Sequence, residues 1–176
     1  FIISKYHLAG VHSFATEAQT VYNVICFRCE MTIFDFYIFD RNGTCLCYSE
    51  WNRKKQSGIS KDEEYKLMYG MLFSIKSFVN RISPTDIKDG FLNFKTSKYM
   101  LHFYETPSGL KLIMNTDLGA GSMRDVLHQI YSTIYVEYVV KNPLCELDKP
   151  ILSELFKSKL DEFIRSLPVF ASKVSQ

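Results

Sequence analysis

The hydrophobic pattern becomes regular at residue 33. Residues 33–39 are almost all aromatic or β-branched, which predicts a strand that is buried on both faces. Asn42 and Gly43 follow, and both residue types tolerate the positive φ that a tight hairpin turn requires. Residues 44–48 then form a second short apolar run. We therefore expect the fold to open with a β-hairpin.

Apolar residues next recur with helical spacing in three segments. Ser60 and Glu63 form a capping box before the first segment, which ends at Ser83-Pro84. The third begins near Asp148, with Pro150 in its first turn. The apolar positions are 67, 68, 71, 72, 75, 78 and 79 in the first segment, 126, 127, 130, 131, 134, 135, 138 and 139 in the second, and 151, 152, 155, 156, 160, 163, 164 and 167 in the third. This spacing predicts three helices.

Three further strands are expected between the first and second helices, over residues 91–94, 99–104 and 110–114. The predicted order is β-β-α-β-β-β-α-α. Short connections between successive strands favour antiparallel pairing. We expect an α+β fold in which helices flank a five-stranded, mostly antiparallel sheet.

Length and composition favour one globular domain. The chain has 176 residues, of which 47% are hydrophobic, with 14 Phe and 11 Tyr. Residues 1–30 lack clean helical or strand periodicity, and Phe1 is not a methionine. We expect residues 1–30 to be a poorly structured extension, with translated upstream sequence as one explanation, and residues 31–176 to be the single domain.

Charge and hydropathy narrow the classes of partner. A net charge of +2 indicates neither a nucleic-acid-binding protein nor a general membrane-binding one. No apolar run approaches the ~20 residues that cross a bilayer, so we expect a soluble protein. The sequence predicts no cofactor.

The cysteines give one chemical alternative. Cys26 and Cys29 form a CxxC motif, and Cys45 and Cys47 form a CxC motif nearby. Four such ligands would suit zinc, but alternate residues of a strand share a face whereas CxxC usually lies in a tight loop. A thiol or metal enzyme stays an alternative, and our expectation is no metal site. The four histidines and the Gly-rich loop 119–121 form no convincing catalytic group, so we expect no catalytic residues.

A basic and aromatic segment follows the hairpin. Trp51 precedes Arg53, Lys54 and Lys55. Trp and Arg are enriched where interfaces carry most of their binding energy, and three cations suit an acidic partner. The other interpretation is a solvated loop with Trp51 packed against the sheet. Both interpretations stay open on sequence alone.

Several segments together resemble a known family, the subunit 1 family of the trafficking protein particle (TRAPP) complex, which tethers vesicles. The resemblance extends from Met31 to about Val169. It is carried by residues 37–43, 49–51, 53–55, 63–74, 88–91, 102–107, 114–117, 135–144, 153–156 and 165–168.

The resemblance implies a longin-like (profilin-like) fold and a role in assembly. It implies that the second strand lies at a sheet edge, where Thr44, Leu46 and Tyr48 would pair with a partner longin-like subunit. It further implies other TRAPP subunits as partners, and guanine nucleotide exchange by the assembled complex on a Rab/Ypt-type GTPase in transport from the endoplasmic reticulum to the Golgi. The expected location is the cytoplasm, with peripheral attachment to cis-Golgi and endoplasmic reticulum membranes. Trp51 and the basic residues after it would add partner surface.

A second function remains open. A freestanding longin-type adaptor of a coat or tether would have the same fold without exchange activity. The proteins that co-purify with the chain distinguish the two. In both functions the chain by itself is not an enzyme.

Overall fold

A computed structural model describes residues 32–53, 55, 58–84 and 91–167. The strands and helices appear in the order β1 (Ile33–Phe39), β2 (Cys45–Glu50), α2 (Lys61–Ile82), β3 (Asn93–Lys95), β4 (Met100–Glu105), β5 (Lys111–Thr116), α3 (Arg124–Gln129), η1 (Ile130–Val140) and α4 (Glu154–Ser166). Because η1 continues α3, the predicted order β-β-α-β-β-β-α-α is confirmed. The predicted boundary at residue 31 lies outside the described residues and stays a prediction.

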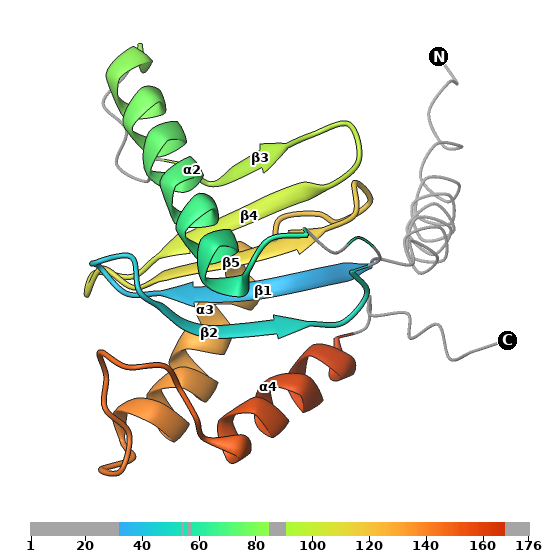
Figure 1. The fold of residues 1–176 in the computed structure, drawn as a ribbon. Coiled ribbons are helices and arrows are strands. Elements are labelled where there is room, and N and C mark those ends of the chain that lie inside the picture. The colour runs from blue at the N-terminus through green and yellow to red at the C-terminus, as the bar shows by residue number, and fades with distance from the viewer. Residues whose placement is uncertain (1–31, 54, 56–57, 85–90, 168–176) are drawn as a thin grey trace, which may run out of the picture. The chain divides into compact units, whose positions relative to one another are not determined.

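The five strands form one antiparallel sheet in the order β2-β1-β5-β4-β3. Helix α2 lies on one face of the sheet, and α3, η1 and α4 lie on the other (Figure 1). Alternate residues of β1 therefore contribute to two hydrophobic cores, one on each face of the sheet. Phe36 and Ile38 pack toward α3 and α4, whereas Tyr37 and Phe39 pack toward α2. This arrangement explains why β1 is apolar on both faces.

The second predicted helix is observed as α3 and η1. Its apolar positions are largely buried, as Leu127, Ile130, Ile134 and Val139 show. Element η1 is a π-helix, which is wider than an α-helix, and at its end the Lys141 amide donates to the carbonyl of Val136, five residues earlier. Among the described residues, no helix is both long and apolar enough to span a membrane.

The predicted start of the third helix, near Asp148, is wrong. Helix α4 begins at Glu154, with Ser153 as N-cap, because the Ser153 hydroxyl accepts a hydrogen bond from the Phe156 amide. A residue before proline is biased toward extended backbone. The segment before Ser153 instead passes along the sheet, where the Ile151 amide donates to the Leu46 carbonyl at 2.7 Å.

The predicted first helix is confirmed, but its apolar stripe is only partly covered. Ser60 caps α2, because its side chain accepts a hydrogen bond from the Glu63 amide. Leu72 is fully buried against the sheet, whereas Leu67 and Phe78 are 60% and 63% exposed. The C-terminal part of α2 projects past the sheet in Figure 1. Exposed apolar side chains on a projecting helix are typical of a surface that another chain covers.

Candidate partner-binding site

Strand β2 lies at an edge of the sheet, as the sequence resemblance implied. The Trp51 amide donates to the Phe34 carbonyl of β1. In an antiparallel ladder, hydrogen-bonded and non-hydrogen-bonded pairs alternate along the strand. The register from Asp35↔Glu50 to Ile38↔Cys47 therefore turns the backbone groups of Leu46, Tyr48 and Glu50 toward the open edge.

The hairpin turn fixes where this edge begins. The Asp40 carboxylate accepts hydrogen bonds from the amides of Asn42 at 2.8 Å and Thr44 at 2.7 Å. Gly43 has a φ of +93°, and a Cβ at this position would lie 2.7 Å from the Tyr69 ring. Glycine is thus required for the backbone conformation and for the close approach of α2. The predicted Asn42-Gly43 hairpin is confirmed.

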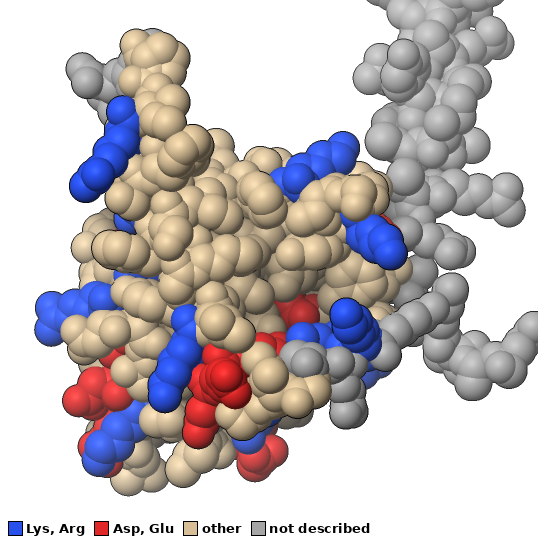
Figure 2. Space-filling model, turned by 45° about the horizontal axis from the view of Figure 1, so that its top comes forward, with Lys and Arg blue, Asp and Glu red and all other residues tan. Residues whose placement is uncertain are grey.

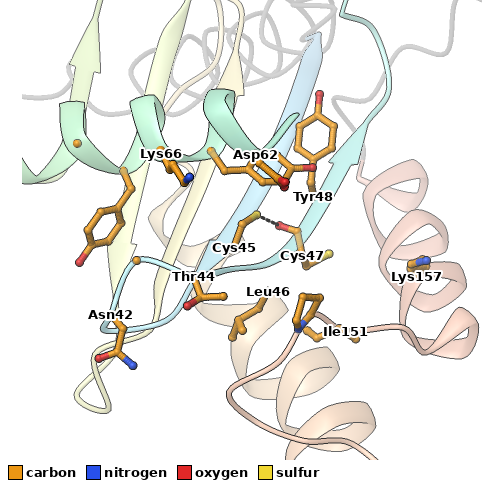
Figure 3. Close-up of a pocket in the computed structure, with 15 residues that line it drawn as sticks. Asn42, Thr44, Cys45, Leu46, Cys47, Tyr48, Asp62, Lys66, Ile151 and Lys157 are labelled. Atoms are coloured by element: carbon orange, nitrogen blue, oxygen red, sulfur yellow. Dashed lines mark hydrogen bonds between the residues drawn. The ribbon is translucent and has the colours of Figure 1, made fainter. Parts of the chain in front are cut away.

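A groove of about 740 Å³ runs along the β2 edge. One wall comes from α2, including Lys66 and Asp62, and the other comes from the segment around Ile151 with Lys157 of α4 (Figure 3). The Leu46 carbonyl on this edge already accepts a hydrogen bond from the Ile151 amide. A chain that pairs with this edge must therefore use groups beyond Leu46 or displace Ile151.

The two β2 cysteines line this groove but are not activated. Burial raises the pKa of the Cys45 thiol to about 12 and that of Cys47 to about 11. Cys45 donates a weak hydrogen bond to the Cys47 carbonyl. Because the thiolate is the nucleophile and the metal ligand, both groups are poor candidates for either role. Cys26 and Cys29 lie outside the described residues, and the described part of the chain contains no cluster of three metal-ligating side chains.

Trp51 connects the end of β2 to α4. Its indole Nε1–H donates to Asp161 Oδ1 at 2.7 Å, and its ring packs partly buried against the core below the sheet. Asp161 also accepts a hydrogen bond from Arg165. These contacts give Trp51 a structural role.

The Arg53 side chain points into the protein. Its Nη1 contacts the Glu64 carboxylate and lies 3.1 Å from Tyr48 Oη, 3.4 Å from Tyr37 Oη and 3.9 Å from Asp35 Oδ2. Arg53 is thus largely committed to groups of its own chain.

The other members of the predicted basic cluster are placed differently. Lys55 is exposed, and its carbonyl accepts a hydrogen bond from Arg53 Nε. Lys54 lies outside the described residues. The structure therefore leaves Lys55 as the described cation of this cluster that is available to a partner.

The pair of Asp35 and Asn115 is a polar site that sequence reasoning missed. The two residues lie side by side on β1 and β5, on the face that α2 covers, and Asn115 Nδ2 donates to Asp35 Oδ1 at 2.7 Å. Burial raises the pKa of the Asp35 carboxyl to about 6. Asn115 Oδ1 is buried and has no hydrogen-bond partner among the described residues. The available sequence signal was one Asp within the apolar β1 and one Asn directly after the apolar residues of β5.

His102 is another buried titratable group on the sheet. Its ring nitrogen lies 2.9 Å from the Thr116 hydroxyl, and burial lowers the pKa of the imidazole to about 4. The side chain is therefore neutral near pH 7. Its hydrogen bond is made within the sheet, between β4 and β5.

Comparison with known proteins identifies the family. The Sybindin-like family matches residues 33–167. "Trafficking protein particle complex subunit 1" of Rattus norvegicus is 66% identical over 143 residues, which are 81% of this chain and 99% of that protein. "Transport protein particle subunit bet5" of Schizosaccharomyces pombe is 40% identical and covers 80% of this chain and 100% of that protein.

A relative with a different subunit name is more distant. "Trafficking protein particle complex subunit 4" of Dictyostelium discoideum is 27% identical over 136 residues, which are 76% of this chain and 97% of that protein. The family match covers all the described strands and helices from β1 to α4, and the sheet order and helix placement fit a longin-like fold. This chain belongs to the Sybindin-like family.

Proposed function

We propose that this chain is a non-catalytic subunit of a TRAPP-type vesicle-tethering complex. The observation that carries the proposal is the 66% identity to a protein named as subunit 1 of that complex, over 99% of its length. Within the complex, the chain contributes surface to guanine nucleotide exchange on a Rab/Ypt-type GTPase in transport from the endoplasmic reticulum to the Golgi. It is cytoplasmic and associates with those membranes peripherally through the assembly.

The proposed way of assembly is pairing at the β2 edge with a second longin-like subunit. The backbone groups of Tyr48 and Glu50 face this edge, and unpaired edge groups are a template for another strand. The distant relative named as subunit 4 supports the idea that two chains of one family meet in one complex. Two related sheets joined edge to edge would form one continuous sheet.

In exchange, the chain acts by binding. A factor that releases nucleotide stabilises the nucleotide-free GTPase more than the nucleotide-bound form, so its surfaces need differential affinity rather than a reacting side chain. An exposed cation such as Lys55 would raise the rate of association with an acidic surface.

The test of assembly is size-exclusion chromatography of the endogenously tagged chain, followed by mass spectrometry of the peak. We expect elution in a large particle together with other TRAPP subunits. Elution alone, at the size of one 20.5 kDa chain, contradicts the proposal. Elution with coat subunits in place of TRAPP subunits indicates the adaptor function instead.

The test of the β2 edge is a bulky substitution at Thr44, the residue just before β2, whose backbone groups bond to Asp40. Thr44 is exposed and lines the groove, so Thr44→Arg should obstruct a chain that lies in the groove beside β2 while the fold stays intact. Ser132→Arg is the matched control, because Ser132 is an exposed hydroxyl residue on η1, away from the edge. We expect Thr44→Arg to lose the paired subunit from the purified particle. Retention of every subunit by both variants rejects pairing at β2.

The test of the basic segment uses Lys54→Glu together with Lys55→Glu. Arg53 stays unchanged, because its inward contacts would confound the result. We expect slower exchange by the assembled complex, with the difference shrinking at high salt as screening increases. An unchanged exchange rate with intact assembly removes this segment from the proposal.

A further inference from the structure

A second hollow, of about 850 Å³, opens on the α2 face of the sheet and is separate from the β2 groove. Asp35 and Asn115 form its floor. Its walls are mainly apolar and include Leu67, Met68 and Met71 of α2, with Tyr99 opposite. Figure 2 shows this side of the molecule, where much of the surface over α2 carries no charge and charged side chains gather at the margins.

A hydrogen-bond acceptor without a partner is buried beneath the floor of the hollow. Asn115 is 7% exposed, its Nδ2 donates to Asp35, and its Oδ1 is closed to solvent and has no partner among the described residues. A buried polar atom without a partner costs free energy that the protein regains only when a donor arrives. The occupant of the hollow should therefore bring an N–H or O–H group.

The walls and rim add two more requirements. Leu67 is 60% exposed, so a large part of its apolar side chain is free to contact an occupant of the hollow. The flexible methionine side chains can adapt to the shape of an aromatic ring and make favourable sulfur–aromatic contacts with it. Lys55 and Lys98 stand exposed at the rim, and neither has an ion-pair partner among the described residues. The amides of Lys98 and Tyr99 both donate to Thr96 Oγ1, which fixes this part of the rim.

We propose that this hollow binds an acidic protein segment that inserts one Tyr or Trp side chain. The ring packs between the methionines of α2 and Tyr99 and displaces the side chains that cover Asn115 Oδ1, so that its O–H or N–H donates to this oxygen. Carboxylates beside the inserted ring pair with Lys55 and Lys98 at the rim. Tyr and Trp are well suited to this role, because each combines a large apolar body with one polar atom.

The inference deepens the proposed function, since it assumes that the chain acts by binding other proteins. It assigns a second docking point on the face opposite α3 and α4. A leucine or methionine anchor would fill the apolar walls equally well but would leave Asn115 Oδ1 unpaired. The requirement for a donor therefore separates the proposed aromatic anchor from a purely apolar one.

The test is an NMR titration of the full ¹⁵N-labelled chain with blocked tripeptides. The first has tryptophan between two glutamates, the second has leucine in place of tryptophan, and the third has two glutamines in place of the glutamates. We expect saturable binding of the first peptide with a Kd below about 1 mM, and at least about threefold weaker binding of the other two. The largest shifts should include the Asn115 side-chain amide.

Two variants at exposed positions locate the site without disturbing the core. Leu67→Ala removes part of a wall, and Lys98→Glu reverses a rim charge. We expect each to weaken the tryptophan peptide about three- to tenfold. Lys95→Glu is the control for charge, because Lys95 is an exposed cation on β3 that does not line the hollow. Its affinity should match that of the unchanged chain.

The results that would overturn the docking site differ from those that would overturn the proposed function. Equal affinity for the tryptophan and leucine peptides overturns the aromatic anchor, and absence of saturable shifts up to about 5 mM overturns the site. Neither result affects assembly, which the size-exclusion experiment measures by itself. Conversely, a chain that binds the first peptide as expected but elutes alone would retain the docking site and lose the proposed TRAPP function.

Discussion

Asp35 is a buried carboxylate whose replacement should stabilise the protein. It lies within the sheet and is 5% exposed. It accepts a hydrogen bond from Asn115, and its Oδ2 lies 3.9 Å from Arg53 Nη1. Asp35→Asn keeps the shape of the side chain and removes the charge. The introduced amide still accepts the hydrogen bond from Asn115 Nδ2, and its own NH₂ can donate to the unpartnered Asn115 Oδ1.

The magnitude follows from the pKa of the Asp35 carboxyl, which burial raises from 3.8 to about 6. The folded state holds its proton longer than the unfolded chain, so the free energy of unfolding falls as the pH rises from about 4 to about 6. A rise of the pKa from 3.8 to about 6 corresponds to about 3 kcal/mol, although the charge of Arg53 by itself lowers the pKa of Asp35. We expect Asp35→Asn to raise the free energy of unfolding by about 1–3 kcal/mol at pH 7.5 and by little at pH 4.

The assay is urea unfolding followed by the fluorescence of Trp51, the single tryptophan of the chain, between pH 4 and 8. The control is Asp148→Asn, which makes the same chemical change at an exposed loop position. At each pH, the free energy of unfolding of the unchanged chain is subtracted from that of the variant, which removes the contribution of all other titrating groups. A variant that is less stable at pH 7.5, by the same amount at every pH, would refute the reasoning, because the carboxylate would then stabilise the fold by contacts that do not depend on its charge.

Three further predictions concern stability and use the same unfolding assay. Gly43→Ala should cost about 1–3 kcal/mol, because its φ is +93° and the new Cβ meets the Tyr69 ring; an unchanged midpoint would mean that the turn and ring adapt freely. Arg53→Ala should cost about 1–3 kcal/mol and Lys55→Ala at most about 0.5, since only the former removes inward contacts; equal costs would contradict this placement. His102→Gln should make the free energy of unfolding fall less steeply as the pH drops from 6.5 to 4. Burial lowers the pKa of His102 to about 4, so in this pH range only the unfolded chain takes up a proton at this residue. An equally steep fall in the variant would mean that other groups cause it.

Local sequence determined most of the secondary structure. Residues 33–39 formed the predicted central strand, Asn42-Gly43 formed the hairpin, and Ser60 capped the first helix, because each outcome depends on side chains within a few residues of one another. The start of α4 was missed by about six residues, since a hydrogen bond from Ile151 to distant Leu46 holds the preceding segment extended.

The candidate sites depended more on tertiary structure. The resemblance to a known family indicated the β2 edge, but the wall that Ile151 and Lys157 add to its groove comes from a segment about 100 residues away in the chain. The sequence indicated that Arg53 is a surface cation, whereas in the structure its guanidinium contacts Glu64 and Tyr48.

What the sequence by itself determined is the family, the order of strands and helices, and the alternation of core residues, because these follow from local periodicity and motif. Only the tertiary structure decided which polar groups are buried together. It brought Asp35 beside Asn115 across 80 residues of chain, and burial at that contact raised the pKa of the carboxyl and left one oxygen without a partner. Desolvation depends on every neighbour that excludes water, and those neighbours come from the whole chain.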